Sequence, residues 1–219
     1  MTISANTLYL DCFSGISGDM LLGALINAGL PQQLLESELA KLNLEPYDFQ
    51  ADDFHVQSIT ATSVTIASRS QQRLKHLSDI TAILNKSTLE RKIIERSLAV
   101  FQCLAEAEAS VHGKPVNEIH FHEVGALDTI IDVVGTVTGL HLLGISAVYC
   151  SPLPLGRGFV KCAHGNLPLP APAVCNLLNN IPVYGVDVTR ELVTPTGAAL
   201  AATLVDHFGK IPPMTPVAT

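Results

Sequence analysis

A short stretch of the chain, HFHEVGALDTIID at residues 120–132, gathers two histidines, one glutamate and two aspartates in a sequence that is 47% hydrophobic and only 15% charged. If His120 and His122 belong to a strand, they share one face, where two imidazoles can bind one metal ion. Glu123 follows at the turn and can add a carboxylate. The stretch therefore predicts a metal site. The alternative is a pair of core imidazoles with ordinary hydrogen-bond partners, and a glutamate that complements a helix dipole.

A helix is expected to follow, over residues 125–143. Asp128, Asp132 and Thr136 recur along it at four-residue intervals, and apolar residues cover most of the remaining circumference. Such a helix should be largely buried. Two aspartates on one narrow polar stripe of a buried helix need a cation, a basic side chain or backbone N–H groups as partners. We therefore add Asp128 and Asp132 to the predicted metal ligands, and Glu123 and Asp128 to the candidate catalytic groups.

A second stretch, DCFSGISGD at residues 11–19, reads as a strand end, a Gly/Ser loop and a helix start. In α/β sheets, ligands bind where such loops leave the strands, and a helix N-terminus offers N–H groups to an anion. Asp11 and Asp19 are candidate catalytic carboxylates. The positions expected to contact an anion are Ser14, Gly15, Ser17 and Gly18. No GK[ST] follows, so the loop is not a P-loop. The alternative is an ordinary turn with Ser17 as the helix N-cap and Asp19 beside the dipole.

Two weaker signals lie further along the chain. Cys162 and His164, two positions apart, could form a soft metal-binding pair, although such a pair in a loop is more often unrelated to metal. Thr196 is expected to cap the last helix, after an extended Thr194-Pro195.

The remaining pattern alternates between short β-like and helical runs, which favours an α/β (mixed α+β) fold: a sheet with several packed helices and a β-hairpin excursion. The excursion suggests a small subdomain around residues 46–75. Strands are expected at 7–13, 147–151 and 183–188, a hairpin with a bulge near Ala61-Thr62 at 55–67, a β-arm at 158–162 within a long connection at 152–172, and helices at 18–28, 32–42, 77–84, 88–112, 173–178 and 197–208.

Composition excludes several classes of protein. The 219 residues carry a formal net charge of −7 and only 13 Lys and Arg, so neither a nucleic-acid surface nor an anionic-membrane surface is expected. The N-terminus lacks the basic and apolar regions of a signal peptide, which predicts a cytoplasmic protein. Five cysteines without a CxxC spacing argue for reduced thiols rather than a disulfide framework or a zinc knuckle.

Five stretches, in order, are similar to one known family: DCFSGISGDM, HFHEVGALDTIID, SPLPLGRG, HGNLPLPAPA and ELVTPTGAAL. On these residues the chain resembles the nickel-insertion proteins of nickel-pincer cofactor biosynthesis, the LarC family, from about Leu8 to its end.

The resemblance implies a CTP-dependent nickel chelatase, or cyclometallase, of the lyase class. Such a protein inserts nickel into pyridinium-3,5-bisthiocarboxylic acid mononucleotide, forming carbon–nickel and sulfur–nickel bonds, while CTP becomes CMP and pyrophosphate with the help of Mn²⁺ or Mg²⁺. The product serves lactate racemase.

The chain departs from the family in two respects. Members are typically about twice as long, with the nucleotide-binding domain in the C-terminal half. This chain is therefore expected to be the N-terminal portion and, by itself, to lack CTP-dependent activity. Its partners would be the precursor nucleotide, the C-terminal half and further copies of itself in a homo-oligomer. Many members also carry a histidine-rich run where this chain reads SRSQQRLKH at residues 68–76.

Together, these features predict that His120, His122 and Glu123 bind a divalent metal with Asp11, Asp19 or Asp128 nearby. The phosphate or carboxylate end of the precursor is expected at residues 14–19 and near His164, Thr194 and Thr196. Two alternatives stay open. One is a non-catalytic scaffold that binds metal or precursor, and the other is a metal-dependent phosphoester hydrolase.

Overall fold

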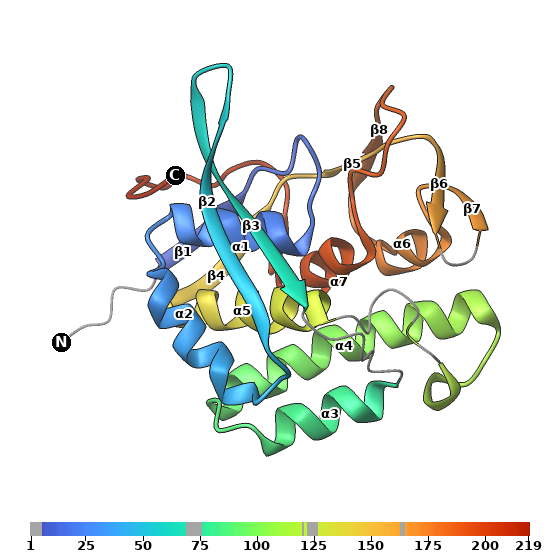
Figure 1. Ribbon diagram of the computed structural model, residues 1–219. Coiled ribbons are helices and arrows are strands. Elements are labelled where there is room, and N and C mark those ends of the chain that lie inside the picture. The colour runs from blue at the N-terminus through green and yellow to red at the C-terminus, as the bar shows by residue number, and fades with distance from the viewer. Residues whose placement is uncertain (1–5, 69–75, 120, 122–126, 163–164) are drawn as a thin grey trace.

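The fold is built on a small parallel sheet whose strands are distant in sequence. The structure, a computed structural model, describes residues 6–68, 76–119, 121, 127–162 and 165–219. Strand β4 (Ile145–Cys150) is central, flanked by β1 (Asn6–Leu10) and β9 (His207–Phe208), and both neighbours run parallel to it. The expected mixed α/β class is confirmed. Figure 1 shows the helices gathered around this sheet, with two hairpins reaching outward.

Helix α5 (Leu127–Leu142) is the centre of the core. It packs against α1 (Gly18–Asn27), α2 (Gln32–Leu39), α4 (Arg91–His112) and α7 (Pro195–Leu204). Apolar residues lie all round it, as the sequence predicted, so it can be buried on every side. Glycines set its distance from α1: a Cβ atom at Gly135 would come within 2.8 Å of the Leu22 side chain, and one at Gly139 within 2.9 Å of Leu25.

The outer helices end where the sequence supplies stop signals. Helix α4 ends at Gly113, which has the left-handed backbone (φ 61°) that glycine adopts without a steric cost. It begins at Arg91, three residues later than expected. Helix α2 stops at Leu39 and tightens into the 3₁₀ turn η1 (Ala40–Leu42), and α3 (Leu77–Lys86) packs against α4. No helix of these described segments is long and apolar enough to cross a membrane.

The first hairpin is longer than predicted, and its turn lies elsewhere. Strands β2 (Tyr47–Val56) and β3 (Ile59–Ser68) pair without a break in register, so the bulge expected near Ala61-Thr62 was wrong. The turn falls at Gln57 and Ser58, which both have positive φ. Glutamine and serine do not usually adopt positive φ in a hairpin turn, so the sequence did not predict a turn at these two residues. Strand β3 packs against α1, and the tip of the hairpin projects away from it (Figure 1).

The long connection over residues 152–172 contains the β-arm that its length suggested. Strand β6 (Gly158–Cys162) pairs with β7 (Gly165–Leu169) as a second hairpin, and β5 (Leu153–Leu155) pairs in parallel with β8 (Val183–Gly185). Helix α6 (Pro172–Leu177) follows and packs against α4.

The last helix is shorter than expected, because the chain returns to the sheet. Helix α7 ends at Leu204 rather than Phe208. The carboxylate of Asp206 then accepts the N–H of Val148 at 2.8 Å, and the N–H of Asp206 donates to the Val148 carbonyl at 2.8 Å. This pair of bonds brings His207 and Phe208 alongside β4 as strand β9.

A substitution in α7 tests how closely this helix packs. Alanine is about 1 kcal/mol better than glycine inside a helix, but a Cβ atom at Gly197 would overlap the carbonyl oxygen of Ile16. We expect Gly197→Ala to lower the free energy of unfolding by about 1–3 kcal/mol, as overpacking does. Urea denaturation measures it. Gly185→Ala is the matched control, because no atom lies within 4 Å of the added Cβ. Equal stability of the two variants would contradict the packing argument.

Candidate functional site

The loop between β1 and α1 is fixed against the segment that precedes α7. Ile16 pairs with Val193 as an isolated parallel bridge. Its N–H donates to the Leu192 carbonyl at 2.9 Å, and its own carbonyl accepts the N–H of Thr194 at 3.1 Å. Gly15 has φ 106°, and a Cβ atom there would overlap the Leu192 carbonyl. Two of the predicted site segments, whose paired residues Ile16 and Val193 are 177 positions apart in sequence, are therefore in direct contact.

The start of α1 brings this loop against α5. Ser17 is the N-cap residue, as expected, but its hydroxyl donates to the carboxylate of Asp19 and makes no capping bond to the helix backbone. Gly18 is buried, and a Cβ atom there would overlap the carboxylate of Asp132. The loop thus lies between α5 on one side and the start of α7 on the other.

Asp132 is the most unusual carboxylate of the described residues. It is partly buried, and its Oδ1 has no hydrogen-bond partner there. Burial, followed by the negative charges of Asp19 and Asp128, raises the pKa of Asp132 to about 8. The predicted need for a partner is therefore real at this position, and a cation is one group that could meet it.

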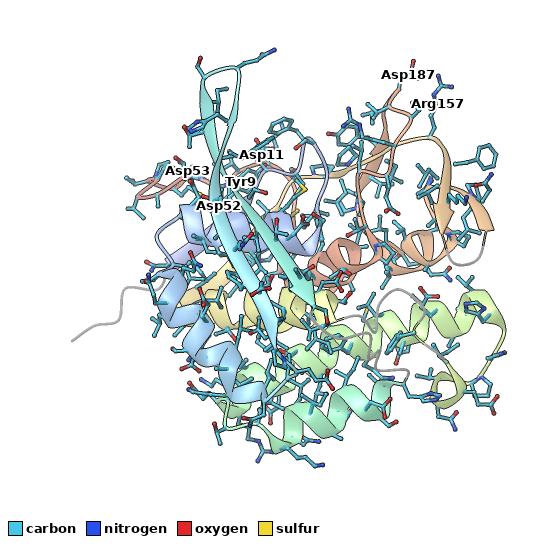
Figure 2. All side chains as sticks on the ribbon, viewed as in Figure 1. Tyr9, Asp11, Asp52, Asp53, Arg157 and Asp187 are labelled. Atoms are coloured by element: carbon cyan, nitrogen blue, oxygen red, sulfur yellow. The ribbon has the colours of Figure 1, made fainter. Side chains whose placement is uncertain are left out.

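The other predicted carboxylates differ from Asp132. Asp128 is exposed, and its Oδ1 accepts the N–H of Thr129 at 2.7 Å, so a backbone donor at the helix start partners it. Asp19 is exposed beside Asp132. Asp11 is also exposed, since β1 ends at Leu10, three residues before the end of the strand expected at 7–13. Together with burial, the Asp11 charge raises the pKa of Tyr9, and both residues are labelled in Figure 2.

Thr194, rather than Thr196, caps α7. Its hydroxyl accepts the N–H of Gly197 at 3.1 Å, and Pro195 takes the first helical position. The prediction for Thr196 was wrong by two positions. Because capping occupies the Thr194 hydroxyl, its structural role is established independently of any ligand.

Four of the predicted site residues lie outside the described residues: His120, His122, Glu123 and His164. Ile119 and Phe121, on either side of His120, are both buried in the core. Neither belongs to a strand, so the strand expected there is not found at these two positions. In the segments that the structure describes, no group of three or more His, Cys, Asp or Glu side chains is arranged to hold a metal ion.

Sequence reasoning missed one pair of residues. Cys12 follows β1, Cys150 ends β4, and their sulfur atoms lie 3.6 Å apart in the core. Only the register of two strands brings them together, and no local pattern reports a register across 138 positions. The prediction likewise did not include the exposed ion pair between Arg157 and Asp187, 2.7 Å from Nε to Oδ1, which Figure 2 labels.

Comparison with known proteins places this arrangement in a family. The family model described as nickel insertion protein matches residues 8–219. The chain belongs to the nickel insertion protein family. It is 51% identical over 210 residues to a putative nickel insertion protein of Desulfotalea psychrophila, covering 96% of this chain and 54% of that protein.

A second nickel insertion protein carries a more specific name. The chain is 50% identical over 204 residues, 93% of its length and 51% of the relative's, to the pyridinium-3,5-bisthiocarboxylic acid mononucleotide nickel insertion protein of Desulfitobacterium hafniense. The chain thus spans about half the length of the curated relatives it matches. No solved structure matches it.

The raised pKa of Asp132 predicts how the free energy of unfolding of this chain depends on pH. Between pH ~4 and ~8 the folded chain keeps a proton that the unfolded chain has lost, so the free energy of unfolding should fall as pH rises through this range. One unit of pKa shift is worth about 1.4 kcal/mol, but partial exposure screens the carboxylate, and we expect a fall of about 1–3 kcal/mol.

Urea denaturation with a chelator present, at several pH values, measures this fall. Asp132→Asn should remove it and be the more stable protein at pH 8, whereas Asp52→Asn, on an exposed stretch of β2, should behave as the wild type. Parallel pH profiles for all three proteins would show that the Asp132 carboxyl is not the group that titrates.

Proposed function

We propose that this chain holds nickel and the precursor in a protein that inserts nickel into pyridinium-3,5-bisthiocarboxylic acid mononucleotide. The family and the printed name of the Desulfitobacterium relative support the reaction. The observation that carries the proposal is that residues 11–19 pack against Asp132 of α5 on one side and against residues 191–197 on the other.

The proposed nickel site is centred on Asp132. Its unpartnered oxygen lies near two further carboxylates, Asp19 and Asp128, and this excess of negative charge favours a divalent cation. Residues 122–126 lead directly into α5, so Glu123 and His122 are within six positions of Asp128 in sequence. We assign His120, His122 and Glu123 as the remaining ligands. Nitrogen and oxygen ligands suit nickel, although they also suit zinc and manganese.

The precursor is proposed to bind beside this site, along the loop before α1. Ser14 is exposed and Ser17 half-buried, so both hydroxyls can reach a phosphate or a carboxylate, and the α1 N-terminus favours a negative charge. Gly15 and Gly18 allow the loop to pack closely against its neighbours and so fix the positions of the two serines. In this proposal the glycines themselves do not contact the ligand. His164 and the Thr194–Thr196 segment are the further proposed contacts.

The proposed chemistry needs a proton acceptor. When a carbon–nickel bond replaces a carbon–hydrogen bond of the pyridinium ring, a proton leaves the carbon, and a nearby carboxylate can accept it. Asp19, Glu123 and Asp128 are the candidates close to Asp132 in space or in sequence. Asp11 is a weaker one, because it lies beside the Cys12–Cys150 pair.

CTP, with Mn²⁺ or Mg²⁺, is proposed to act through the C-terminal half of the longer relatives. The isolated chain, cytoplasmic and homo-oligomeric in this proposal, would then bind nickel and precursor without completing the reaction. A non-catalytic scaffold that binds metal or precursor is the second candidate, because the chain spans about half the length of its curated relatives.

Nickel titration by calorimetry tests the proposed site. Wild-type chain should bind Ni²⁺, and Asp132→Asn should weaken binding tenfold or more, because it replaces the partly buried carboxyl group at the centre of the proposed site with an amide that cannot ionise. The His120→Ala/His122→Ala double variant should lose as much. Asp52→Asn, which removes an equal charge from β2, should bind as the wild type does. Unchanged affinity in both site variants would refute the nickel assignment.

Reconstitution tests the reaction itself. A full-length relative, incubated without oxygen with precursor, nickel and CTP, should activate apo lactate racemase, and the variant equivalent to Asp132→Asn should do so at least tenfold less. Omitting CTP should abolish activation. If the 219-residue chain activated the racemase alone, the proposed need for the C-terminal half would be wrong.

A further inference from the structure

Two cysteine thiols meet where the first two strands of the sheet end. Cys150 pairs in register with Leu10, and Cys12 lies two residues beyond Leu10. The N–H of Cys12 donates to the Ser151 hydroxyl at 2.9 Å, and the N–H of Ser151 donates to the Leu10 carbonyl at 2.9 Å. These bonds fix both backbones, so the 3.6 Å between the two sulfur atoms follows from the fold.

The two thiols differ in acidity. Either thiol can donate in the bond between the two sulfur atoms; with Cys150 as the donor, this bond lowers the pKa of Cys12, although burial and the nearby Asp11 charge act to raise it. The same bond, together with burial, raises the pKa of Cys150. Cys12 is therefore the sulfur that ionises first, and Cys150 is the thiol beside it.

We propose that Cys12 and Cys150 are a reversible oxidation site, at which hydrogen peroxide converts the two thiols into an internal disulfide. The sulfur atoms must approach from 3.6 Å to about 2.05 Å, a movement that small side-chain rotations can supply. Cys12 is buried, but its chain neighbours Asp11 and Phe13 are both exposed, so Cys12 lies close to the surface from which a small oxidant would enter.

The reaction has two balanced steps. The Cys12 thiolate attacks one peroxide oxygen, the O–O bond breaks, and Cys12 becomes a sulfenic acid while hydroxide leaves and takes up a proton as water. The Cys150 sulfur then attacks the Cys12 sulfur, the S–O bond breaks, and the oxygen leaves as water with the Cys150 proton. Both sulfur atoms are oxidised and the peroxide is reduced to two water molecules. A low-molecular-weight thiol restores the pair by exchange.

The modification would act on the loop that carries Ser14–Asp19. Cys12 is at its start, and the Ile16 bonds to residues 192 and 194 hold it further along. Drawing Cys12 toward β4 must therefore change the path of the few residues between these two fixed points. The oxidation itself does not rest on the proposed nickel function, so its test is independent of that function.

The experiment treats the folded chain with hydrogen peroxide, removes the peroxide with catalase, denatures the protein and alkylates every remaining thiol. Before alkylation, we expect a mass lower by two hydrogen atoms than that of the untreated chain. After alkylation, we expect two fewer alkylated cysteines and a tryptic fragment that joins the Cys12 and Cys150 peptides. Dithiothreitol should reverse all three changes.

Single variants provide the controls. Cys12→Ser and Cys150→Ser should each give no internal link, while Cys175→Ser, which removes an exposed thiol, should link as the wild type does. Thermal melting confirms that the variants fold. Oxidation of Cys12 to a sulfinic acid with Cys150 still free, a link to another cysteine, or no reaction of either thiol would each overturn the proposal.

Discussion

Three glycines fix the geometry on which the candidate site depends, because at each of them a neighbouring group occupies the space that a Cβ atom would fill. Gly15 admits the Leu192 carbonyl, Gly18 admits the Asp132 carboxylate, and Gly197 admits the Ile16 carbonyl. The loop before α1 is thereby enclosed by α5 and by the start of α7. A motif rich in glycine and serine can be mistaken for a flexible anion-binding loop. Here its glycines form a rigid, closely packed junction, and only its serines are left to contact a ligand.

Elements whose signals are local were predicted well. Helix α5 is apolar all round and therefore buried, and α4 ends at a glycine in the left-handed conformation. The hairpin turn at Gln57 and Ser58 was missed, since residues that usually take positive φ are absent there. Strand β9 was read as helix, because the bond between Asp206 and Val148 that ends α7 joins positions 58 apart.

The candidate site, too, was predictable only where its signals are local. A polar stripe on a buried helix indicated Asp132, and burial does leave the Oδ1 atom of this carboxylate without a hydrogen-bond partner among the described residues. Its neighbour Asp128, four positions earlier, is exposed instead and accepts a backbone N–H, because it lies in the first turn of α5. Periodicity places two residues on one face of a helix, but it does not show how far along that face the neighbouring elements bury the helix.

The contacts of the loop with α7 and with β4 were beyond sequence reasoning. They depend on the register of parallel strands and on an isolated bridge, and neither leaves a periodic signal. Thr194 illustrates the difficulty. Both Thr194 and Thr196 are suitable N-cap residues by type. Thr194 is the cap because its N–H donates to the Ile16 carbonyl, which fixes the backbone before the helix starts.

Electrostatics connects this rigid junction to metal chemistry. A carboxylate that packs against Gly18 has lost part of its hydration, and Asp19 and Asp128 add repulsion, so ionising Asp132 costs folding free energy. A bound divalent cation would offset both costs, since it attracts all three carboxylates. The same packing that destabilises the ionised carboxylate would therefore favour cation binding there, at the cost of releasing the Asp132 proton when the metal enters. In the proposed function, reprotonation of Asp132 would in turn favour transfer of nickel to the precursor.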